Sequence, residues 1–471
     1  MKIGLVGSSY QQRSLPFDAQ RTVNLFPIAD PQGADVAALY GTPGLSLFST
    51  AGSGPIRGCL AAANLRAFVV SGATLYEIDS AGTATSRGTL TTSSGIVTIA
   101  DNGFQLGICD GASVYMFTYL TNAFAKVTDP DLPSAANISF VDGYFVVTKN
   151  NSGQFYISAL YDGTSWNALD FASAESSPDD LSIATNFVGQ LGLFGHDTLE
   201  IWRNTGDSTF PFARISGSTP IGTIAPNTVI SLDTSVYWVG NTSEGSGIVY
   251  QAQGFTPKRI STDAIELILQ RETQPELLRT WGYQQEGHVF LVITGANLGT
   301  SLVYDLSTQL WHERAYLNSA GNYEQHLGSC CMYAFNKQLV GDRTTGKVYS
   351  MSMDVFSDNG DAIKRQRIYT HLIDELNYVK YTDLQLGFET GVGLQSGQGS
   401  DPQVSLRLSK DGARTWTDYY TTSIGAAGVF GQQVKFRRLG IQQSCTFEIT
   451  ISDPVKVAIT GSYLNKRDAN G

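Results

Sequence analysis

Residues 68–78 read Phe68-Val69-Val70-Ser71-Gly72-Ala73-Thr74-Leu75-Tyr76-Glu77-Ile78: a short apolar run, a glycine turn and a second run built around an aromatic residue. Short runs of this kind, bounded by Gly and polar residues, are typical of β-strands joined in hairpins. The same arrangement recurs along the chain as far as Asp354. Its seven occurrences are residues 68–70 with 74–78, 106–108 with 113–117, 145–147 with 154–157, 191–194 with 199–202, 236–239 with 248–250, 289–292 with 302–305 and 338–340 with 347–350.

The spacing of these pairs predicts the architecture. A repeat of roughly 40 to 55 residues made of short strands is typical of a radial β array, most simply a β-propeller. One such sheet cannot bury both of its faces, so successive units must pack on one another. We therefore predict an all-β fold in which residues 51–355 form a β-propeller-like array of about seven small antiparallel sheets. Six or eight sheets would also be compatible with the spacing, because the later units carry insertions.

Residues 1–50 contain few periodic runs and are predicted to form an irregular N-terminal arm. Within it, residues 44–48 read Gly-Leu-Ser-Leu-Phe and are expected to form a strand. The seventh unit shows only about three strands after His326. We therefore expect the arm to supply a closing strand to that unit, which would remove the exposed sheet edges of an open ring.

The pattern changes after Asp354. A turn-rich joint at residues 357–361 is followed by runs that alternate apolar and polar residues, which predict a C-terminal β-sandwich of about seven strands over residues 356–471. These runs are residues 380–388, 404–409, 434–439, 447–451 and 455–459. One helix is predicted over residues 261–271, with Asp263 and Glu266 spaced as a capping box. We expect it to pack across the ring.

Composition limits the classes of function. Charged residues make up 15% of the chain, against about 25% in an average globular protein, so much of the surface is expected to be buried within the fold or in an assembly. The formal net charge is −11, and it lies in the repeats: residues 1–357 hold 18 Lys and Arg against 30 Asp and Glu, whereas residues 358–471 hold 13 against 12. A protein that grips nucleic acid through its phosphates would show the opposite balance.

Cysteine usage and hydropathy predict the compartment. The five Cys are odd in number and show neither metal-ligand spacing nor a disulfide framework, which favours synthesis in a reducing cytoplasm. No stretch approaches the roughly 18 apolar residues of a membrane span. Residues 1–8 are too short for a secretory signal. We expect a protein made without export and with no membrane partner.

No motif for chemistry is present in the sequence. It contains no Gly-x-Ser-x-Gly, no His-Glu-x-x-His and no phosphate-binding loop. The five His are scattered over distant units, and the neighbouring carboxylates at residues 179–180 and 374–375 point to opposite sides of an extended chain. Residues 409–416, Ser-Lys-Asp-Gly-Ala-Arg-Thr-Trp, resemble an Asp-box hairpin, with a weaker echo at residues 161–166. Both are interpreted as hairpin corners, and we nominate no catalytic, cofactor-binding or metal-binding residue.

The chain as a whole resembles the packaged-DNA stabilisation proteins of short-tailed bacteriophages, which form the tail hub or nozzle. The resemblance spans nearly the full length and follows the order of arm, strand-rich units, helix and sandwich. The motifs that carry it are residues 24–27 (Asn-Leu-Phe-Pro), 41–45 (Gly-Thr-Pro-Gly-Leu), 174–179 (Ala-Glu-Ser-Ser-Pro-Asp), 198–202 (Thr-Leu-Glu-Ile-Trp), 259–266 (Arg-Ile-Ser-Thr-Asp-Ala-Ile-Glu), 409–412 (Ser-Lys-Asp-Gly) and 455–461 (Val-Lys-Val-Ala-Ile-Thr-Gly).

This resemblance implies a structural virion protein and no enzyme. Members of the family assemble as a homohexameric ring below the portal and adaptor, retain packaged DNA, hold tail fibres or spikes and the plug or needle, and form part of the ejection channel. An acidic bore would let DNA pass without sequence-specific binding, because like charges repel. We expect the subunit or adaptor contacts to lie on the near-neutral sandwich, where Arg pairs well with carboxylates. The candidate interface residues are Lys364, Arg365, Arg367, Arg437 and Arg438.

Two other classes of protein remain open at this point. A glycan-binding or sialidase-like propeller tail protein would need an arginine cluster, an acid and a nucleophile converging at the mouth of the propeller. A cellular propeller that serves as an interaction platform would behave as a monomer in solution. Neither class predicts a ring that binds a portal.

Overall fold

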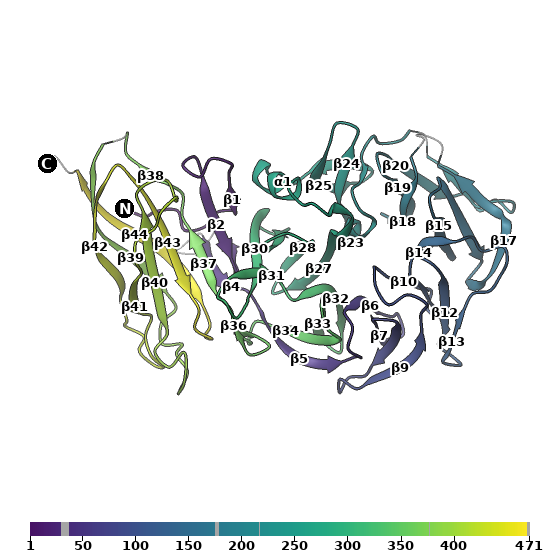
Figure 1. Cartoon of the computed structure of the whole chain (residues 1–471), viewed down its shortest axis with the longest axis horizontal. Coiled ribbons are helices and arrows are strands. Elements are labelled where there is room, and N and C mark those ends of the chain that lie inside the picture. Colours follow the sequence, from purple (N-terminus) through teal and green to yellow (C-terminus); the bar gives the residue numbers. More distant parts are fainter. Residues whose placement is uncertain (30–36, 175–178, 216, 376, 469–471) are drawn as a thin grey trace.

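The computed structural model describes residues 1–29, 37–174, 179–215, 217–375 and 377–468. A ring of small sheets lies beside a sandwich of two sheets (Figure 1). The predicted fold class, an all-β propeller-like array followed by a β-sandwich, is confirmed. Residues 175–178, part of one motif quoted above, and residues 469–471, the end of the predicted C-terminal domain, lie outside the described residues.

The first four sheets of the ring follow one another along the chain, each with four antiparallel strands in sequence order. The first is β6 (Ile56–Ala61), β7 (Ala67–Ser71), β8 (Thr74–Ile78) and β9 (Ala84–Thr89). The second is β10 (Thr98–Asp101), β11 (Gln105–Cys109), β12 (Val114–Thr118) and β13 (Ala123–Lys126). The third is β14 (Ala135–Val141), β15 (Tyr144–Lys149), β16 (Gln154–Ala159) and β17 (Asp162–Ser173). The fourth is β18 (Leu181–Phe187), β19 (Gln190–Gly195), β20 (Leu199–Asn204) and β21 (Phe212–Arg214).

The last three sheets of the ring are larger or joined to other elements. The fifth is β22 (Gly222–Thr223), β23 (Ile230–Leu232), β24 (Ser235–Thr242), β25 (Gly245–Gln253) and β26 (Thr256–Arg259). The sixth is β27 (Arg279–Gln285), β28 (His288–Thr294), β29 (Ser301–Asp305) and β30 (Leu310–Leu317), with β31 (Tyr323–Gln325) paired to β30. The seventh is β32 (Gly328–Ala334), β33 (Lys337–Asp342), β34 (Lys347–Ser352) and β5 (Gly44–Thr50), extended by β35 (Ser357–Asp358) and β36 (Asp361–Ala362).

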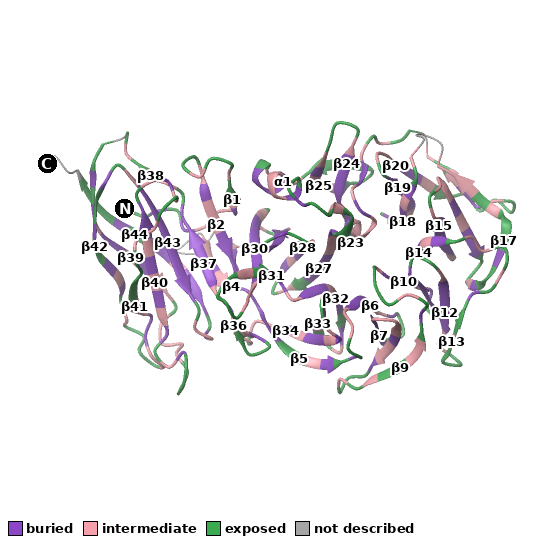
Figure 2. Ribbon diagram, in the orientation of Figure 1, coloured by how far each residue is buried: buried purple, intermediate pink, exposed green. Residues whose placement is uncertain are grey.

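An apolar cluster joins each sheet of the ring to the next, and the series closes on itself. Phe68 of the first sheet meets Phe117 of the second with ring centroids 5.4 Å apart. Val69 of the first sheet and Val348 of the seventh share the cluster that completes the cycle, and both are fully buried. Burial of such a side chain contributes about 1.5–3 kcal/mol, so the stability of the ring comes from contacts between sheets. In Figure 2, buried residues lie on the strands and exposed residues lie mainly in the loops.

The N-terminal arm supplies a strand to the seventh sheet. The expected strand at residues 44–48 lies within β5, which pairs antiparallel with β34 in a register that places Leu45 opposite Met351 and Gly44 opposite Ser352. The edge of β34 that faces away from β33 is therefore covered by a segment roughly 300 residues earlier in the chain. Pairing of β5 from the arm with the last sheet of the ring completes that sheet.

The sandwich packs two sheets around one core. One sheet is β3 (Leu25–Ala29), β4 (Ala37–Gly41), β44 (Ala458–Asp468), β39 (Val379–Phe388) and β42 (Val434–Gln442). The other contains β37 (Arg365–Ile368), β43 (Ser444–Ile451), β40 (Gln403–Ser409) and β41 (Tyr420–Ser423), with β38 (Leu372–Ile373) paired to β43. The core includes Leu384, Leu406 and Phe447, together with Ile3 and Leu5 from the arm.

The prediction that residues 1–50 are irregular is wrong. Besides β3, β4 and β5, the arm contains β1 (Tyr10–Gln11) and β2 (Ala19–Val23), which pair with each other. Strand β2 also pairs with β30 of the propeller and with β37 of the sandwich, so that one 12-stranded sheet runs through both domains. Strands β2, β4 and β5 each pair with a distant segment, which the local sequence cannot show, whereas β1 with β2 and β3 with β4 are local pairs.

Polar side chains of the arm fix this junction. Asn24 donates from Nδ2 to the carbonyl oxygens of Ala315 and Lys364, both at 2.9 Å, and its Oδ1 accepts from the Ala315 amide at 2.9 Å. One buried amide therefore links the sixth sheet, the arm and the start of the sandwich. Beside it, Arg21 pairs with the buried Glu313 of β30, with Nε 3.0 Å from Oε1. Separation of the domains would break these hydrogen bonds and the ion pair of the buried Glu313, so the contacts oppose hinge motion.

The predicted helix is shorter than expected. Helix α1 (Asp263–Leu269) has Thr262 as its N-cap and no side-chain capping bond, so the predicted capping box is wrong. Glu266 instead accepts from Ser261 Oγ at 2.6 Å and from Arg259 Nε at 2.6 Å. Ile265 is fully buried in the cluster between the fifth and sixth sheets. Two 3-10 turns, η1 (Pro226–Thr228) and η2 (Pro275–Leu277), lie nearby in sequence. No helix among the described residues is long and apolar enough to cross a bilayer.

Candidate functional site

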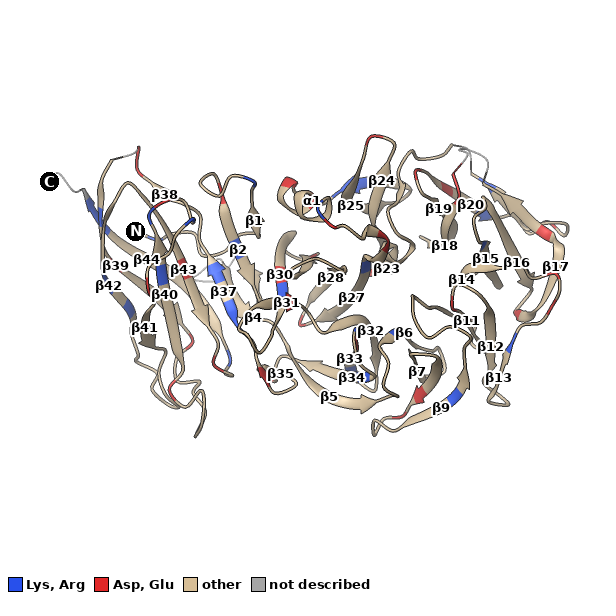
Figure 3. Ribbon diagram, in the orientation of Figure 1, with Lys and Arg blue, Asp and Glu red and all other residues tan. Residues whose placement is uncertain are grey.

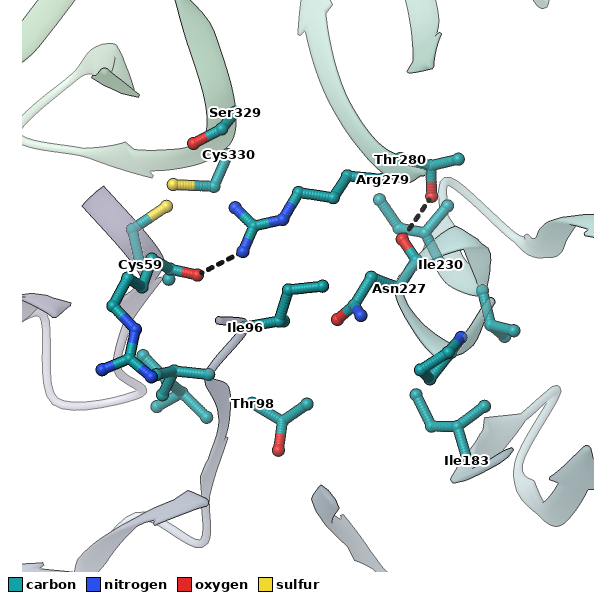
Figure 4. A pocket seen from close by; sticks show the side chains of 16 residues that line it. Cys59, Ile96, Thr98, Ile183, Asn227, Ile230, Arg279, Thr280, Ser329 and Cys330 are labelled. Atoms are coloured by element: carbon teal, nitrogen blue, oxygen red, sulfur yellow. Dashed lines mark hydrogen bonds between the residues drawn. The ribbon is translucent and has the colours of Figure 1, made fainter. Parts of the chain in front are cut away.

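The inner strands of the propeller sheets surround a pocket near the axis of the ring. It has two lobes of about 200 and 260 Å³, which share Arg57, Ile96, Arg279 and Ser329. Figure 4 shows the first lobe, with side chains from β6, β18, β27, β32 and the segments around β10 and η1 directed toward one space. Residues from six of the seven sheets meet there because a radial array brings the first strand of every unit to the centre.

Arg57 is a structural residue of this pocket. Its Nε donates to the Gly95 carbonyl at 2.8 Å, and its two terminal nitrogens donate to Gly72, Thr92 and Ser94 at 2.6 to 2.9 Å. A guanidinium has five N–H donors, and all of them have partners. Arg57 thus holds the loop before β10 in place and adds positive charge to the pocket, but no free donor.

Arg279 has a different environment. The only hydrogen bond from its side chain to a described residue runs from Nη2 to the carbonyl oxygen of Arg57, at 3.2 Å. Burial lowers the pKa of Arg279 from its usual value, and no nearby carboxylate raises it again. Arg343 borders the second lobe and keeps its Nε buried without a partner in the described structure. The pocket therefore gathers three arginines.

The lining of both lobes contains no Asp, Glu or Tyr. The arginine cluster required by the sialidase-like alternative is present at the axis, but the acid and the nucleophile that such an enzyme needs are not brought to it. Two thiols, Cys59 of β6 and Cys330 of β32, lie side by side in the same lobe (Figure 4). Sequence reasoning missed all of these residues, because they belong to the first, sixth and seventh units.

The five histidines are not gathered into a site. Among the described residues no group of three or more His, Cys, Asp or Glu could hold a metal ion. His312 lies in the core of the sixth sheet with both ring nitrogens unpartnered by any described residue, and His326 keeps Nε2 unpartnered. Burial lowers the pKa of each of these two side chains to about 3. Both are neutral structural residues.

These two histidines predict acid sensitivity. In the unfolded chain each takes up a proton below about pH 6.5, whereas in the folded protein each stays neutral down to about pH 3. The stability they contribute is complete above pH 6.5 and is lost as the pH falls toward 3. We expect each to lower the free energy of unfolding by about 3 kcal/mol between pH 7 and pH 4. Urea unfolding at several pH values gives the free energy of unfolding as a function of pH. Between pH 7 and pH 4 this free energy should fall less steeply for His312→Leu than for the wild type. An equal fall in the two proteins would contradict the assignment.

Two of the five candidate interface residues are interior. Arg365 and Arg367 of β37 are each 1% exposed, so neither guanidinium can reach a partner. Arg367 donates from Nε to the Leu5 carbonyl at 2.7 Å and from Nη2 to Gln20 Oε1 at 2.7 Å. Burial lowers the pKa of both arginines to about 10. The placement of Arg365 and Arg367 on the contact surface is therefore wrong, because these side chains bind the chain's own backbone and N-terminal arm.

The other three candidates reach the surface. Lys364 is half-buried, with its Nζ 5.2 Å from the centre of the Tyr323 ring. Arg437 and Arg438 are exposed on β42, the outermost strand of its sheet in the described structure, and Arg438 has a φ of +63°. They border a hollow of about 470 Å³ that also contacts Lys380 and the half-exposed Ile441. Figure 3 shows blue residues along the sandwich strands, while red residues are spread over several propeller sheets.

The two turn motifs are hairpin corners, as interpreted. Asp411 accepts from the amides of Arg414 and Thr415 at 3.0 and 2.9 Å, which closes the turn. Trp416 is half-buried, and the Arg407 guanidinium lies 4.9 Å from its ring centre. At the weaker motif, Trp166 donates from Nε1 to the Gly163 carbonyl at 2.9 Å. Neither motif places a free carboxylate in a pocket described above.

A closed propeller held to a sandwich by one shared sheet defines a two-domain β-structural protein. The bacteriophage P22 Gp10 family matches this chain in two parts, its β-propeller over residues 1–356 and its β-sandwich over residues 364–466. The chain therefore belongs to this family of phage packaged-DNA stabilisation proteins, which confirms the resemblance inferred from the sequence motifs. It is a structural protein of a phage virion.

No curated protein sequence matches the chain. Among solved structures, it is similar to YCF48 bound to D1 peptide, with 14% identity and a TM-score of 0.40 over 66% of this chain and 96% of that one. It is also similar to the Pan2 WD40 domain of Neurospora crassa, with 10% identity and a TM-score of 0.41 over 63% and 89% of the two chains. The Cps50 (Swd1) β-propeller domain of Myceliophteria thermophila gives 10% identity and a TM-score of 0.43 over 65% and 99%. These similarities are too low to bear on function.

Proposed function

We propose that this chain forms the tail hub, or nozzle, of a short-tailed phage. Six copies would form a ring that lies below the portal and adaptor, retains packaged DNA and forms part of the ejection channel. Tail fibres or spikes and a plug or needle would attach to the same ring. The observation that carries the proposal is the 12-stranded sheet, which joins both domains through β2. A protomer without a flexible linker suits a ring that must hold its shape against pressure.

The charge distribution supports the passage of DNA. The propeller half of the chain carries the net negative charge, so phosphates would be repelled from most of its surface rather than bound. The axial arginines lie inside each protomer and not on a broad face. DNA would therefore move past the ring without sequence-specific contacts.

We further propose that Lys364, Arg437 and Arg438 contact a neighbouring subunit or the adaptor. Two exposed arginines on an outer strand beside an open hollow suit a partner that presents carboxylates and an apolar side chain. On a solitary protein, charged residues on an edge strand would serve only to discourage strand pairing. Charge reversal separates these two roles.

The double variant Arg437→Glu with Arg438→Glu is expected to weaken ring assembly by roughly tenfold or more, because like charges would then face each other across the contact. Since both side chains are exposed, the unfolding midpoint should stay close to that of the wild type. Mass photometry of the purified protein, alone and with a portal–adaptor complex, measures the assembly. Arg203→Glu, at an exposed position of β20 on the propeller, is the matched control. Normal rings from the double variant would reject this contact, and a monomer that ignores the portal would reject the tail-hub role.

A further inference from the structure

The axial pocket contains more hydrogen-bond donors than the fold uses. Arg279 donates one hydrogen bond to the Arg57 carbonyl, and its remaining N–H groups have no acceptor among the described residues. The side chain is half-buried and none of its nitrogens is sealed from solvent without a partner, so these groups face the cavity. An arginine held in this way carries a full charge and a planar set of donors that an added ligand can reach.

One further donor group faces the same space. The side-chain amide of Asn227 in η1 makes no hydrogen bond to any described residue, and Figure 4 shows it directed into the lobe that contains Arg279. Thr98 also lines the lobe, but its Oγ1 accepts from the Ile138 amide at 2.9 Å and points away from Arg279 in Figure 4. Ser329 is not available either, because its hydroxyl already donates to the Ile56 carbonyl at 3.1 Å. The available groups are thus mostly donors.

The charge around these donors is positive. Arg57 contributes a cation whose hydrogen bonds all go to neutral oxygens of its own sheet and the following loop, and the nearby Asp110 carboxylate binds Thr92 instead. Arg343 adds a third cation at the second lobe, with Glu324 3.5 Å away and half-exposed. The chain has a net charge of −11, but the pocket is lined by three arginines and by no carboxylate. The charge of the pocket is therefore positive.

We propose that the propeller axis is a binding site for a small oxyanion, phosphate or carboxylate, with Arg279 as its principal ligand-binding residue. Guanidinium forms paired hydrogen bonds with either group, and lobes of about 200 and 260 Å³ leave room for such an ion with water. Asn227 adds a neutral donor from η1 (Figure 4). Occupancy of the site would tie η1 to the sixth sheet at the axis, beside Arg57 of the first. This inference goes beyond the tail-hub role and does not depend on it.

Isothermal titration of the full-length protein with inorganic phosphate, and separately with succinate, tests the site at constant ionic strength against chloride. We expect one anion per chain, and a preference between the two ligands identifies its chemistry. Arg279→Met should weaken binding by roughly tenfold or more through loss of charged hydrogen bonds, and Arg279→Lys should fall between because it keeps the charge without the planar fork. Arg203→Met, exposed on β20, should bind like the wild type.

Circular dichroism of each variant establishes that it is folded. Should Arg279→Met fail to fold, Asn227→Ala provides the test, since its side chain has no described partner to lose, and we expect it to weaken binding several-fold. The proposal is overturned if the wild type binds neither phosphate nor succinate above the chloride background. It is equally overturned if folded Arg279→Met, or Asn227→Ala in its place, keeps wild-type affinity.

Discussion

Leu45→Asp is expected to lower the free energy of unfolding by about 4 kcal/mol or more and to leave the propeller open. Leu45 is fully buried in β5, in the apolar cluster that joins the sixth and seventh sheets. A carboxylate at this position would lose the packing of the leucine and would be buried without a positive partner, and each of these costs is large. Detachment of β5 would then expose the edge of β34 to other chains.

The same strand offers a matched control. Leu47 lies two residues along β5 and is 50% exposed, so Leu47→Asp introduces the same charge at the surface. Urea unfolding followed by tryptophan fluorescence, together with size-exclusion chromatography, compares the two variants. We expect Leu45→Asp to unfold at much lower urea and to aggregate, and Leu47→Asp to behave like the wild type. Equal midpoints for the two would show that β5 does not close the ring.

Arg367→Met is expected to lower the free energy of unfolding by about 3–5 kcal/mol. The Arg367 guanidinium binds the Leu5 carbonyl, Gln20 Oε1 and Thr22 Oγ1 at 2.7 to 2.9 Å, and no carboxylate of a described residue pairs with it. Methionine fills part of the space but leaves these buried oxygens without a donor. Gly7 packs directly against this arginine, since a Cβ there would lie 2.7 Å from Nη2. The loss should therefore be concentrated in residues 3–22 of the arm.

Hydrogen exchange measured by mass spectrometry locates the effect. We expect amides of residues 3–22 to lose protection in Arg367→Met before the propeller sheets do. Arg438→Met, at an exposed position of the same domain, should change stability by less than about 0.5 kcal/mol. Unaltered protection of the arm in Arg367→Met would mean that the guanidinium is not what fastens the arm to the sandwich.

The sequence predicted the parts of the fold that are local. Each pair of apolar runs forms neighbouring antiparallel strands with a short connection, and the pair at residues 68–70 and 74–78 is joined by a tight turn, so the runs and the turn residues between them are enough to recognise it. Strands β2 and β4 were missed because each pairs, at least in part, with a segment hundreds of residues away, whereas β3 pairs with the nearby β4. The distant strands that hydrogen-bond to β2 and β4 lie outside any short stretch of sequence around them.

The candidate sites show the same division. Arg365 and Arg367 were assigned to a contact surface because they belong to the near-neutral sandwich and because Arg pairs well with carboxylates. Both side chains are interior because they donate hydrogen bonds to backbone oxygens: Arg365 to Asp453 and Arg367 to Leu5 of the arm. Composition cannot reveal such contacts. Arg57 and Arg279 each lie on the innermost strand of a unit. Both arginines therefore occupy the first strand of a repeat, which lies at the axis of the ring. The sequence would show this position only if the repeats were aligned by their first strands as well as by their aromatic strands.

The threading of the arm through both domains also determines when a protomer can fold during synthesis. Strand β5 must wait for β34 at residues 347–352, and β4 must wait for β44 at residues 458–468. Contacts of such long sequence separation slow folding, because the intervening loop must close first. Neither the seventh sheet of the propeller nor the first sheet of the sandwich can therefore be completed until late in synthesis. The sandwich sheet that contains β4 cannot be completed before residues 458–468 have been translated, so the arm must stay unpaired, or pair elsewhere, during most of synthesis.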